Sequence, residues 1–280
     1  MQTRREFLGT LGFGALGAAT LASTRSNGQA SEPPSRMPIG IQLYTLRSLL
    51  ERDFDGTLAR IAEIGYREVE FAGYYKRTPK EVRAVLKRTG LKAPSAHIPL
   101  PASDDDWKRA LDAAKIIGHE WAVVPWLDET QRKGLPQMAD RLNHLATMTK
   151  AAGLRQAYHN HDFEFAAAPG GGTLLDLLLT HTDPKLVSFE MDCYWVTKAG
   201  HDPLALLAKY PGRFPLLHLK DATAAPERRM VDVGSGTIDF TAILRADKKY
   251  LKHIFVEHDQ PADPLASARV SYTNISKLRF

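Results

Sequence analysis

The second half of the chain repeats one pattern: a short apolar run ends, and residues that can bind a metal ion or transfer a proton follow it. The polar groups after the four runs are His159 to Asp162, Glu190 with Asp192, His218 to Asp221, and Glu257 to Asp259. Carboxylates and imidazoles gathered in one place can hold a divalent cation and act as general acids and bases. Short apolar runs between helical stretches are typical of buried parallel strands, and such sheets carry active sites where the strands end. The pattern therefore indicates an enzyme.

Three of these residues, Asp192, His218 and Glu257, occupy equivalent ends of three successive predicted strands. In a closed barrel these ends converge on one axis. One imidazole and two carboxylates with open positions suit one divalent ion such as Mn²⁺, Mg²⁺, Co²⁺ or Zn²⁺. Taken singly, each residue fits a hydrogen-bonded polar network or an ordinary loop acid better than a metal ligand. The three together at matched positions favour a metal site.

Strand and helix patterns alternate along the chain, and they predict a fold of the α/β class. The predicted strands are 39–44, 68–71, 93–98, 121–125, 154–160, 186–192, 214–220 and 253–257, and the predicted helices are 53–64, 78–89, 104–117, 134–152, 173–181, 202–209, 238–246 and 263–280. Eight strands and eight helices in strict alternation predict a single (β/α)8 TIM barrel. The first strand is not followed by G-x-G-x-x-G, so a dinucleotide-binding fold has no support.

The amino terminus has the pattern of an export signal. Thr3-Arg4-Arg5-Glu6-Phe7-Leu8 is a twin-arginine motif, and the apolar, glycine-rich stretch 8–22 and a small-residue region follow it. Such a stretch is too short for a comfortable transmembrane helix, although a short anchor or a disordered terminus is the alternative. We predict a twin-arginine signal peptide over 1–30, a linker over 31–38 and the barrel over 39–280. The mature protein would then be periplasmic or secreted, with no membrane segment of its own.

Composition adds few constraints. The formal net charge is +5, and residues 1–30 contribute three arginines and one glutamate, so their removal leaves +3. This balance does not indicate a nucleic-acid partner. The single cysteine, Cys193, excludes an internal disulfide. The sequence does not specify an oligomeric state.

Five motifs together resemble the sugar phosphate isomerase/epimerase superfamily, the xylose isomerase-like βα-barrels. The motifs are Gly40 to Tyr44, the stretch YHNHDFEF over 158–165, Phe189 to Trp195, Leu217 to Asp221, and Phe255 to Asp259. The resemblance runs from Ile39 to near the carboxyl terminus. Each motif is moderately specific, and their shared order and spacing carry the resemblance.

The resemblance implies one metal ion held by residues from the fifth to the eighth strands. By it, Asp192, His218 and Glu257 supply three ligands. His159 stands where many relatives have a metal-binding Glu that also helps to move the substrate proton, so the usual two-carboxylate epimerisation is in doubt. His159 and His161 share a strand face, so either is the fourth ligand and the other is a base or a substrate contact. We favour His159 as the ligand, the alternative being a buried histidine paired with Glu190.

Further residues are candidates for catalysis and substrate binding. His161 or Glu164 is the candidate base, and Lys220 could stabilise an enediolate or instead pair with Asp221 or Glu190. Glu190 shares the Asp192 face and must be paired because a buried lone carboxylate is costly. The substrate-binding candidates are Glu70, His97, Trp126 and Trp195. The glycines around Ser235 predict a flexible loop that closes over the site.

These residues predict a metal-dependent enzyme acting on a small carbohydrate, either a keto-sugar or a sugar derivative. A base would remove a proton next to a carbonyl, and the resulting enediolate would lead to isomerisation, to epimerisation, or to elimination from a 3-keto-glycoside by a lyase or hydrolase. The alternatives are a non-catalytic sugar-binding barrel and a phosphodiesterase like the AP endonucleases. A sugar-binding barrel without catalysis would fit a chain that had lost Asp192, His218 or Glu257, and all three are present. A phosphodiesterase would require more metal ligands and a basic surface.

Overall fold

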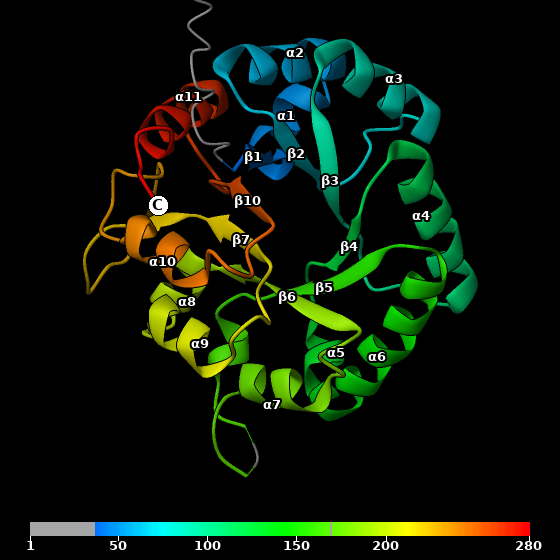
Figure 1. Cartoon of the computed structure of the whole chain (residues 1–280), viewed down its shortest axis with the longest axis vertical. Coiled ribbons are helices and arrows are strands. Elements are labelled where there is room, and N and C mark those ends of the chain that lie inside the picture. The colour runs from blue at the N-terminus through cyan, green and yellow to red at the C-terminus, as the bar shows by residue number, and fades with distance from the viewer. Residues whose placement is uncertain (1–36, 169) are drawn as a thin grey trace, which may run out of the picture. The chain divides into compact units, whose positions relative to one another are not determined.

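Eight parallel strands close into a barrel in the order β1-β10-β7-β6-β5-β4-β3-β2 (Figure 1). The computed structural model describes residues 37–168 and 170–280, so the predicted signal peptide lies outside the described residues. The barrel strands are β1 (Ile39–Gln42), β2 (Glu68–Phe71), β3 (Lys92–His97), β4 (Trp121–Val124), β5 (Arg155–His159), β6 (Val187–Asp192), β7 (Leu216–Leu219) and β10 (His253–Val256). The predicted (β/α)8 barrel is confirmed.

Helices surround the barrel as an outer ring in Figure 1. The larger ones are α2 (Phe54–Ile64), α3 (Pro79–Thr89), α4 (Asp104–Ile117), α6 (Leu135–Ala151), α7 (Leu174–His181), α9 (Pro203–Lys209), α10 (Phe240–Asp247) and α11 (Pro264–Ile275). The shorter elements are α1 (Arg47–Leu50), α5 (Glu129–Lys133), α8 (Cys193–Lys198), the 3-10 helices η1 (Leu43–Leu46) and η2 (Phe163–Phe165), and the small hairpin of β8 (Asp221–Ala222) and β9 (Met230–Val231). Across the described part of the chain, no helix combines the length and the apolar character that crossing a membrane requires.

The helices begin where short polar side chains can cap them. Thr78 and Thr173 form capping boxes with Glu81 and Asp176 at the starts of α3 and α7. The side chains of Asp53, Ser103, Asp202, Asp239 and Asp263 cap α2, α4, α9, α10 and α11. Each cap satisfies backbone N–H groups that have no partner inside the helix. The helix starts are therefore set by sequence that is visible before the fold is known.

The strands bury different side chains on their two faces. On β6, Val187, Phe189 and Met191 belong to the apolar core between the barrel and the helices, whereas Glu190 and Asp192 alternate with them and point into the barrel. A small apolar cluster of Trp121, Val123, Ala157 and Leu216 is separate from that core. These four residues share the inward parity on β4, β5 and β7, so on these strands the barrel interior is apolar below the polar layer.

The short helix α8 was not predicted, and it fixes the end of β6. Asp192 is its N-cap, and its Oδ1 accepts a hydrogen bond of 3.0 Å from the backbone N–H of Trp195. An Asp directly before the run Cys193 to Val196 is an N-cap signal that was available in the sequence. The cap leaves only Oδ2 of Asp192 for other contacts.

The loop after β9 is anchored by hydrogen bonds to Asp221, and its closing over the site stays a prediction. The Asp221 carboxylate accepts hydrogen bonds from the backbone N–H groups of Gly234 and Gly236, both at 2.9 Å, and of Ile238 at 3.2 Å. A side chain on Gly236 would meet Asp221 and the carbonyl of Ala222. Asp221 is therefore a loop anchor and does not pair with Lys220.

Asp247, the last residue of α10, gives a prediction about stability. Its side chain is 3% exposed, Oδ2 has no hydrogen-bond partner among the described residues, and burial raises the pKa to about 6. Its pKa in the unfolded chain is lower, so the carboxyl favours the fold fully below about pH 4, and this contribution is lost progressively as the pH rises through 6. We expect Asp247→Asn to raise the thermal midpoint by about 2 °C at pH 8 and by less at pH 4.5.

Thermal unfolding followed by circular dichroism at the two pH values measures this effect. Asp140→Asn, at an exposed position on α6, is the control and should change neither midpoint. A gain for Asp247→Asn that is equal at both pH values would show that the buried charge is not its cause.

Candidate active site

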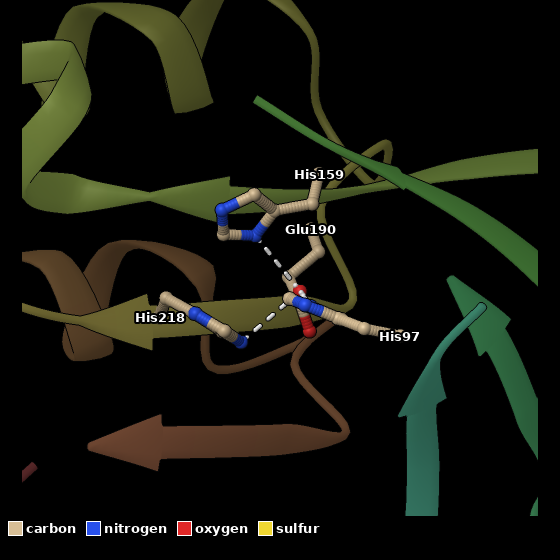
Figure 2. Close-up of side chains that lie close together, drawn as sticks. All are labelled: His97, His159, Glu190 and His218. Atoms are coloured by element: carbon tan, nitrogen blue, oxygen red, sulfur yellow. Dashed lines mark hydrogen bonds and ion pairs between the residues drawn. The ribbon is translucent and has the colours of Figure 1, made fainter. Parts of the chain in front are cut away.

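The centre of the candidate site is the carboxylate of Glu190, on which three imidazoles converge from β3, β5 and β7 (Figure 2). Its Oε2 lies 2.8 Å from His97 Nε2, 2.9 Å from His159 Nδ1 and 3.1 Å from His218 Nε2. Glu190, His159 and His218 are buried, and the His97 side chain is largely so. A buried carboxylate is stable only with such partners, so these contacts supply the pairing that sequence reasoning required.

A second carboxylate, Glu70 on β2, completes this layer. It accepts hydrogen bonds from Gln42 Nε2 at 2.7 Å and Ser95 Oγ at 2.5 Å, and its Oε2 lies 2.6 Å from His218 Nε2. Each partner points inward from a different strand. Glu70 is fully buried and does not line the cavity described below, so the structure gives it a supporting position rather than the substrate contact that was predicted.

The charges of this layer are strongly coupled. Burial alone would lower the pKa of His218, but Glu190 and Glu70 raise it well above its usual value. Burial alone would raise the pKa of Glu190, but His218 and His159 hold it well below the usual range. Burial and the neighbouring Glu190 raise the pKa of Glu70. Glu190 is therefore the ionised partner of the histidines.

A second layer lies above the first, at the carboxyl ends of β6, β7 and β10. Lys220 Nζ lies 3.2 Å from Asp192 Oδ2, 2.9 Å from Glu257 Oε2 and 2.8 Å from Asp259 Oδ1. His218 reaches this layer with its other nitrogen, because Nδ1 lies 2.7 Å from Glu257 Oε2. The structure thus brings together Asp192, His218 and Glu257, as the sequence analysis predicted.

Lys220 and the carboxylates shift one another's pKa values. Burial disfavours the ammonium, but Asp192, Glu257 and Asp259 raise the pKa of Lys220 well above its usual value. Burial raises the pKa of Asp192 to about 6, although Lys220 opposes the shift. Burial also disfavours the Glu257 carboxylate, but Lys220 and His218 hold its pKa below the usual range. Lys220 is therefore a charged ammonium at the mouth of the barrel.

His159 is placed to contribute a free ring nitrogen to this layer. Burial lowers its pKa to about 3, so the ring is neutral and carries one proton. Because Glu190 is ionised, the proton sits on Nδ1, which donates a hydrogen bond to Glu190. The other ring nitrogen, Nε2, lies 3.7 Å from Asp192 Oδ2 and keeps its lone pair. A carboxylate that fixes the tautomer of a histidine in this way is the usual arrangement around metal-binding imidazoles.

These residues fit a divalent cation. The candidate ligand atoms of Asp192, His218 and Glu257 lie within 4.8 Å of one another, and Asp192 Oδ2 accepts no hydrogen bond although Lys220 is near. Two carboxylate oxygens with one or two imidazole nitrogens form a common donor set for such ions. A second group, His97, His159, Glu190 and His218, also meets the distance criterion. Its carboxylate oxygen is already shared by three imidazoles, so we assign to it the support of the first group.

A cavity of about 600 Å³ opens above these layers, and aromatic side chains form much of its wall. Trp126, which is 48% exposed, and Tyr44, which is 42% exposed, stand at its mouth. The His161 ring lies 4.6 Å from the Trp126 ring and 5.5 Å from the Trp195 ring, measured between centroids. Rings beside a polar floor are suited to a ligand that has both apolar faces and hydroxyl groups.

Arg132 on α5 holds one side of this wall. Its guanidinium lies 4.1 Å from the centre of the Trp126 ring and 3.7 Å from that of Phe163, and its Nε donates to the carbonyl of Leu127 at 2.7 Å. Such cation–π contacts restrain an exposed tryptophan. The wall is therefore built by α5 and by the loop that follows β5.

The predicted site residues fall into two sets. Seven of them line the cavity: His97, Trp126, His159, His161, Trp195, Lys220 and Glu257. Asp192 and His218 lie buried beneath it, as does Glu70. The lining residues that were not proposed for the site include Tyr44, which follows β1, and Asp259, which contacts Lys220. Asp259 could have been found by the same rule as the others, because it follows a strand end.

Glu164 is the predicted residue that the structure places away from the cavity. Its side chain is fully buried, Tyr158 donates to its Oε1 at 2.6 Å, and the backbone N–H of His161 donates to its Oε2 at 2.8 Å. Burial raises its pKa to about 7 against the effect of these hydrogen bonds. Glu164 thus fixes the turn that presents His161.

The fold and the site together define a (β/α)8 barrel with a carboxylate–histidine cluster at the carboxyl end of its strands. The sequence profile of one family, the xylose isomerase-like TIM barrel, matches residues 58–271. The chain belongs to this family.

Similar proteins agree with this assignment. The inosose dehydratase of Geobacillus kaustophilus is 25% identical over 272 residues, covering 80% of this chain and 85% of the relative. Inosose dehydratase 2 of Bacillus cereus is 36% identical, covering 61% of this chain and 64% of the relative. A solved sugar phosphate isomerase/epimerase from Parabacteroides distasonis superposes with a TM-score of 0.74 at 26% identity, covering 88% of this chain and 96% of that one.

The contact between Tyr158 and Glu164 gives a prediction about pH. Since the pKa of Glu164 is higher in the fold than in the unfolded chain, this group favours the fold most below about pH 4.5 and loses that effect as the pH rises through 7. Tyr158→Phe removes a donor from the carboxylate and raises this pKa further. We expect a loss of stability of about 1–3 kcal/mol at pH 8 and a smaller loss at pH 5.5.

Urea unfolding at both pH values measures the two losses. Tyr66→Phe is the matched control, because the buried Tyr66 hydroxyl donates to a backbone carbonyl, that of Ala268, at 2.8 Å. The loss of stability in Tyr66→Phe should be the same at pH 5.5 and at pH 8. A loss for Tyr158→Phe that does not change with pH would refute the link to the Glu164 charge.

Proposed function

We propose that this protein is a metal-dependent enzyme that removes a proton next to the carbonyl of a keto-sugar or of a related cyclic keto-polyol. The observation that carries the proposal is the cluster of Asp192, His218, Glu257 and Lys220 beneath an aromatic cavity. The names of its relatives, inosose dehydratase and sugar phosphate isomerase/epimerase, support a carbohydrate substrate.

Asp192, His218, Glu257 and the Nε2 of His159 would hold the metal ion. When bound, a divalent ion supplies Lewis acidity toward a carbonyl and an adjacent hydroxyl oxygen, which makes the neighbouring C–H more acidic. Glu190 and Glu70 keep the two histidines in the orientation that this binding needs.

Lys220 would stabilise the negative charge that forms on the substrate oxygen. Its ammonium lines the cavity and is held by Asp259, which remains available when other cations occupy Asp192 and Glu257. A fixed positive charge in a site shielded from water lowers the energy of an enediolate more than the same charge in water does. Lys220 would also donate a proton to a substrate oxygen.

His161 is the base in this proposal. Its ring lines the cavity, its Nδ1 has no hydrogen-bond partner among the described residues, and burial lowers its pKa well below the usual range. It is therefore unprotonated whenever substrate binds. A base this weak can act only on a C–H that other groups have already acidified, so its role depends on the cation and on Lys220.

The fate of the enediolate decides the reaction class. Return of the proton to carbon gives isomerisation or epimerisation, and departure of the β-substituent gives elimination. We favour elimination, either of water or of the sugar residue from a 3-keto-glycoside. Relatives named as dehydratases support this choice, and so does His159 in place of the glutamate that epimerases use for the second proton transfer.

We further propose that the enzyme is exported by the twin-arginine route and works in the periplasm or outside the cell. The support is the motif at Arg4 and Arg5 with the apolar stretch after it. Export of an already folded barrel suits a protein that carries a metal ion.

Metal content tests the first part of the proposal. Asp192→Asn and His218→Ala should retain no bound metal after gel filtration, whereas the wild type should retain about one equivalent. Glu190→Gln should bind the same metal roughly 10- to 100-fold more weakly, because it changes the support of the histidines and leaves the ligands intact. Plasma mass spectrometry and metal titration give these numbers.

Asp162→Asn is the control for these variants, because Asp162 lines the same cavity and makes no hydrogen bond or ion pair with the described residues of the cluster. The Asp162→Asn variant should bind metal like the wild type. Full metal content and full activity in both Asp192→Asn and His218→Ala would contradict the proposal.

Lys220 gives a test that separates catalysis from metal binding. Lys220→Met removes a cation that lies within 3.2 Å of Asp192 and Glu257, so metal binding should be retained or tightened. The rate of proton abstraction should fall roughly a thousandfold. Exchange of the substrate's α-hydrogen in D₂O, followed by NMR with an inosose and a 3-keto-glycoside, measures this step directly.

Binding of either compound by the wild-type protein without exchange or turnover would instead favour the non-catalytic sugar-binding barrel. Release of a phosphate ester product from DNA would favour the phosphodiesterase.

A further inference from the structure

A second cavity lies at the opposite end of the barrel from the candidate active site. It has a volume of about 580 Å³, and the residues that line it sit at or before the starts of strands, including Trp121 on β4, Arg155 on β5 and Pro215 before β7. Parallel strands place all their starts at one end and all their ends at the other. This amino-terminal cavity is therefore separate from the cluster around Glu190.

The charges around the amino-terminal cavity are all positive. Its cations are Lys150, Arg155, Lys185, Lys249 and Lys252, and no aspartate or glutamate is among its lining residues. Among the described residues, none of these five cations has an ion pair with a carboxylate. Glu120 and Asp183 lie on neighbouring turns, and Asp183 is engaged with the backbone N–H of Lys185 at 2.8 Å. Five like charges around one concavity raise its potential and attract anions.

Neutral groups complete the cavity. Trp121 is only 3% exposed, and its buried Nε1–H has no hydrogen-bond partner among the described residues. A buried donor without a partner is uncommon because it costs free energy. The Tyr250 ring is 37% exposed and lies under Lys249, 5.1 Å from its Nζ. The cavity therefore offers the hydrogen-bond donors of its five cations and one aromatic face, and no carboxylate acceptor.

We propose that the amino-terminal cavity binds a compact oligophosphate, a molecule with two or more phosphate groups close together. Cations spread over five positions match several negative charges better than one, and the guanidinium of Arg155 can bind two oxygens of one phosphate. The volume is within the range of small-molecule sites. Because this end of the barrel is remote from the carbohydrate cavity, the oligophosphate and the sugar can be bound together.

Calorimetric titration of the full chain with tripolyphosphate, pyrophosphate and orthophosphate in 50 mM NaCl tests this site. We expect the affinity to rise with the number of phosphate groups and to fall with added salt. The double variant Arg155→Gln/Lys252→Gln should bind tripolyphosphate roughly tenfold more weakly. A second pair, Lys150→Gln/Lys185→Gln, gives the same test if the first is poorly folded.

Lys87→Gln/Lys115→Gln is the matched control, because it removes two exposed lysines from α3 and α4 and so leaves the same net charge. Its affinity for tripolyphosphate should stay within about twofold of the wild type. An equal loss in this control, or orthophosphate binding as tight as tripolyphosphate binding, would overturn the proposal and indicate general attraction to a basic surface.

Tripolyphosphate also binds divalent ions, so the titration is repeated with Asp192→Asn. Unchanged affinity in this variant places the anion away from the carboxyl end of the barrel, as proposed. Loss of binding in Asp192→Asn would place it at the metal centre and overturn the proposal.

Discussion

The arrangement of this barrel depends on one buried carboxylate, that of Glu190. A lone charge at this depth would cost several kcal/mol, and the three imidazoles from β3, β5 and β7 offset that cost together. The same contacts fix the tautomer of His159 and turn the second nitrogen of His218 toward Glu257. Glu190 therefore acts on the upper layer through the histidines without lining the cavity itself, and the geometry of the mouth follows from an interaction one layer below it.

In the upper layer the buried charge is positive, and its partners are negative. Here a buried ammonium, Lys220, is stabilised by three carboxylates. Asp192 is constrained from both sides, since Oδ1 caps α8 while Oδ2 faces Lys220 and His159. A short helix that looks incidental thus aims the oxygen on which metal binding would depend. The strand ends provide the metal-binding residue types. The helix cap at Asp192 and the tautomer of His159 decide which of their atoms face the site.

The sequence predicted most of the fold and much of the site, for identifiable reasons. Alternating runs and helix caps such as Thr78 predict element order, and strand parity predicts that Glu190 and Asp192 face inward. The alternation of side chains along a strand cannot predict how deep a residue lies along the barrel axis. For this reason Glu70 was expected to contact the substrate, whereas it lies buried beneath the cavity. Nor can the alternation show whether a polar side chain turns back onto its own chain, as Glu164 does toward the His161 N–H. Those outcomes depend on packing between distant strands.

The replacement at position 159 has a consequence for the charge of the site. Among the described residues, Asp192, Glu257 and Asp259 are the carboxylates that pair with Lys220 in the upper layer, and the neutral His159 adds no negative charge to them. Three negative charges and one ammonium sum to minus two, which one divalent ion neutralises. A third carboxylate ligand would leave the loaded site negative and would oppose the formation of an enediolate. In the proposed reaction, whose transition state would add negative charge, a neutral histidine would therefore be better suited to this position than a further carboxylate.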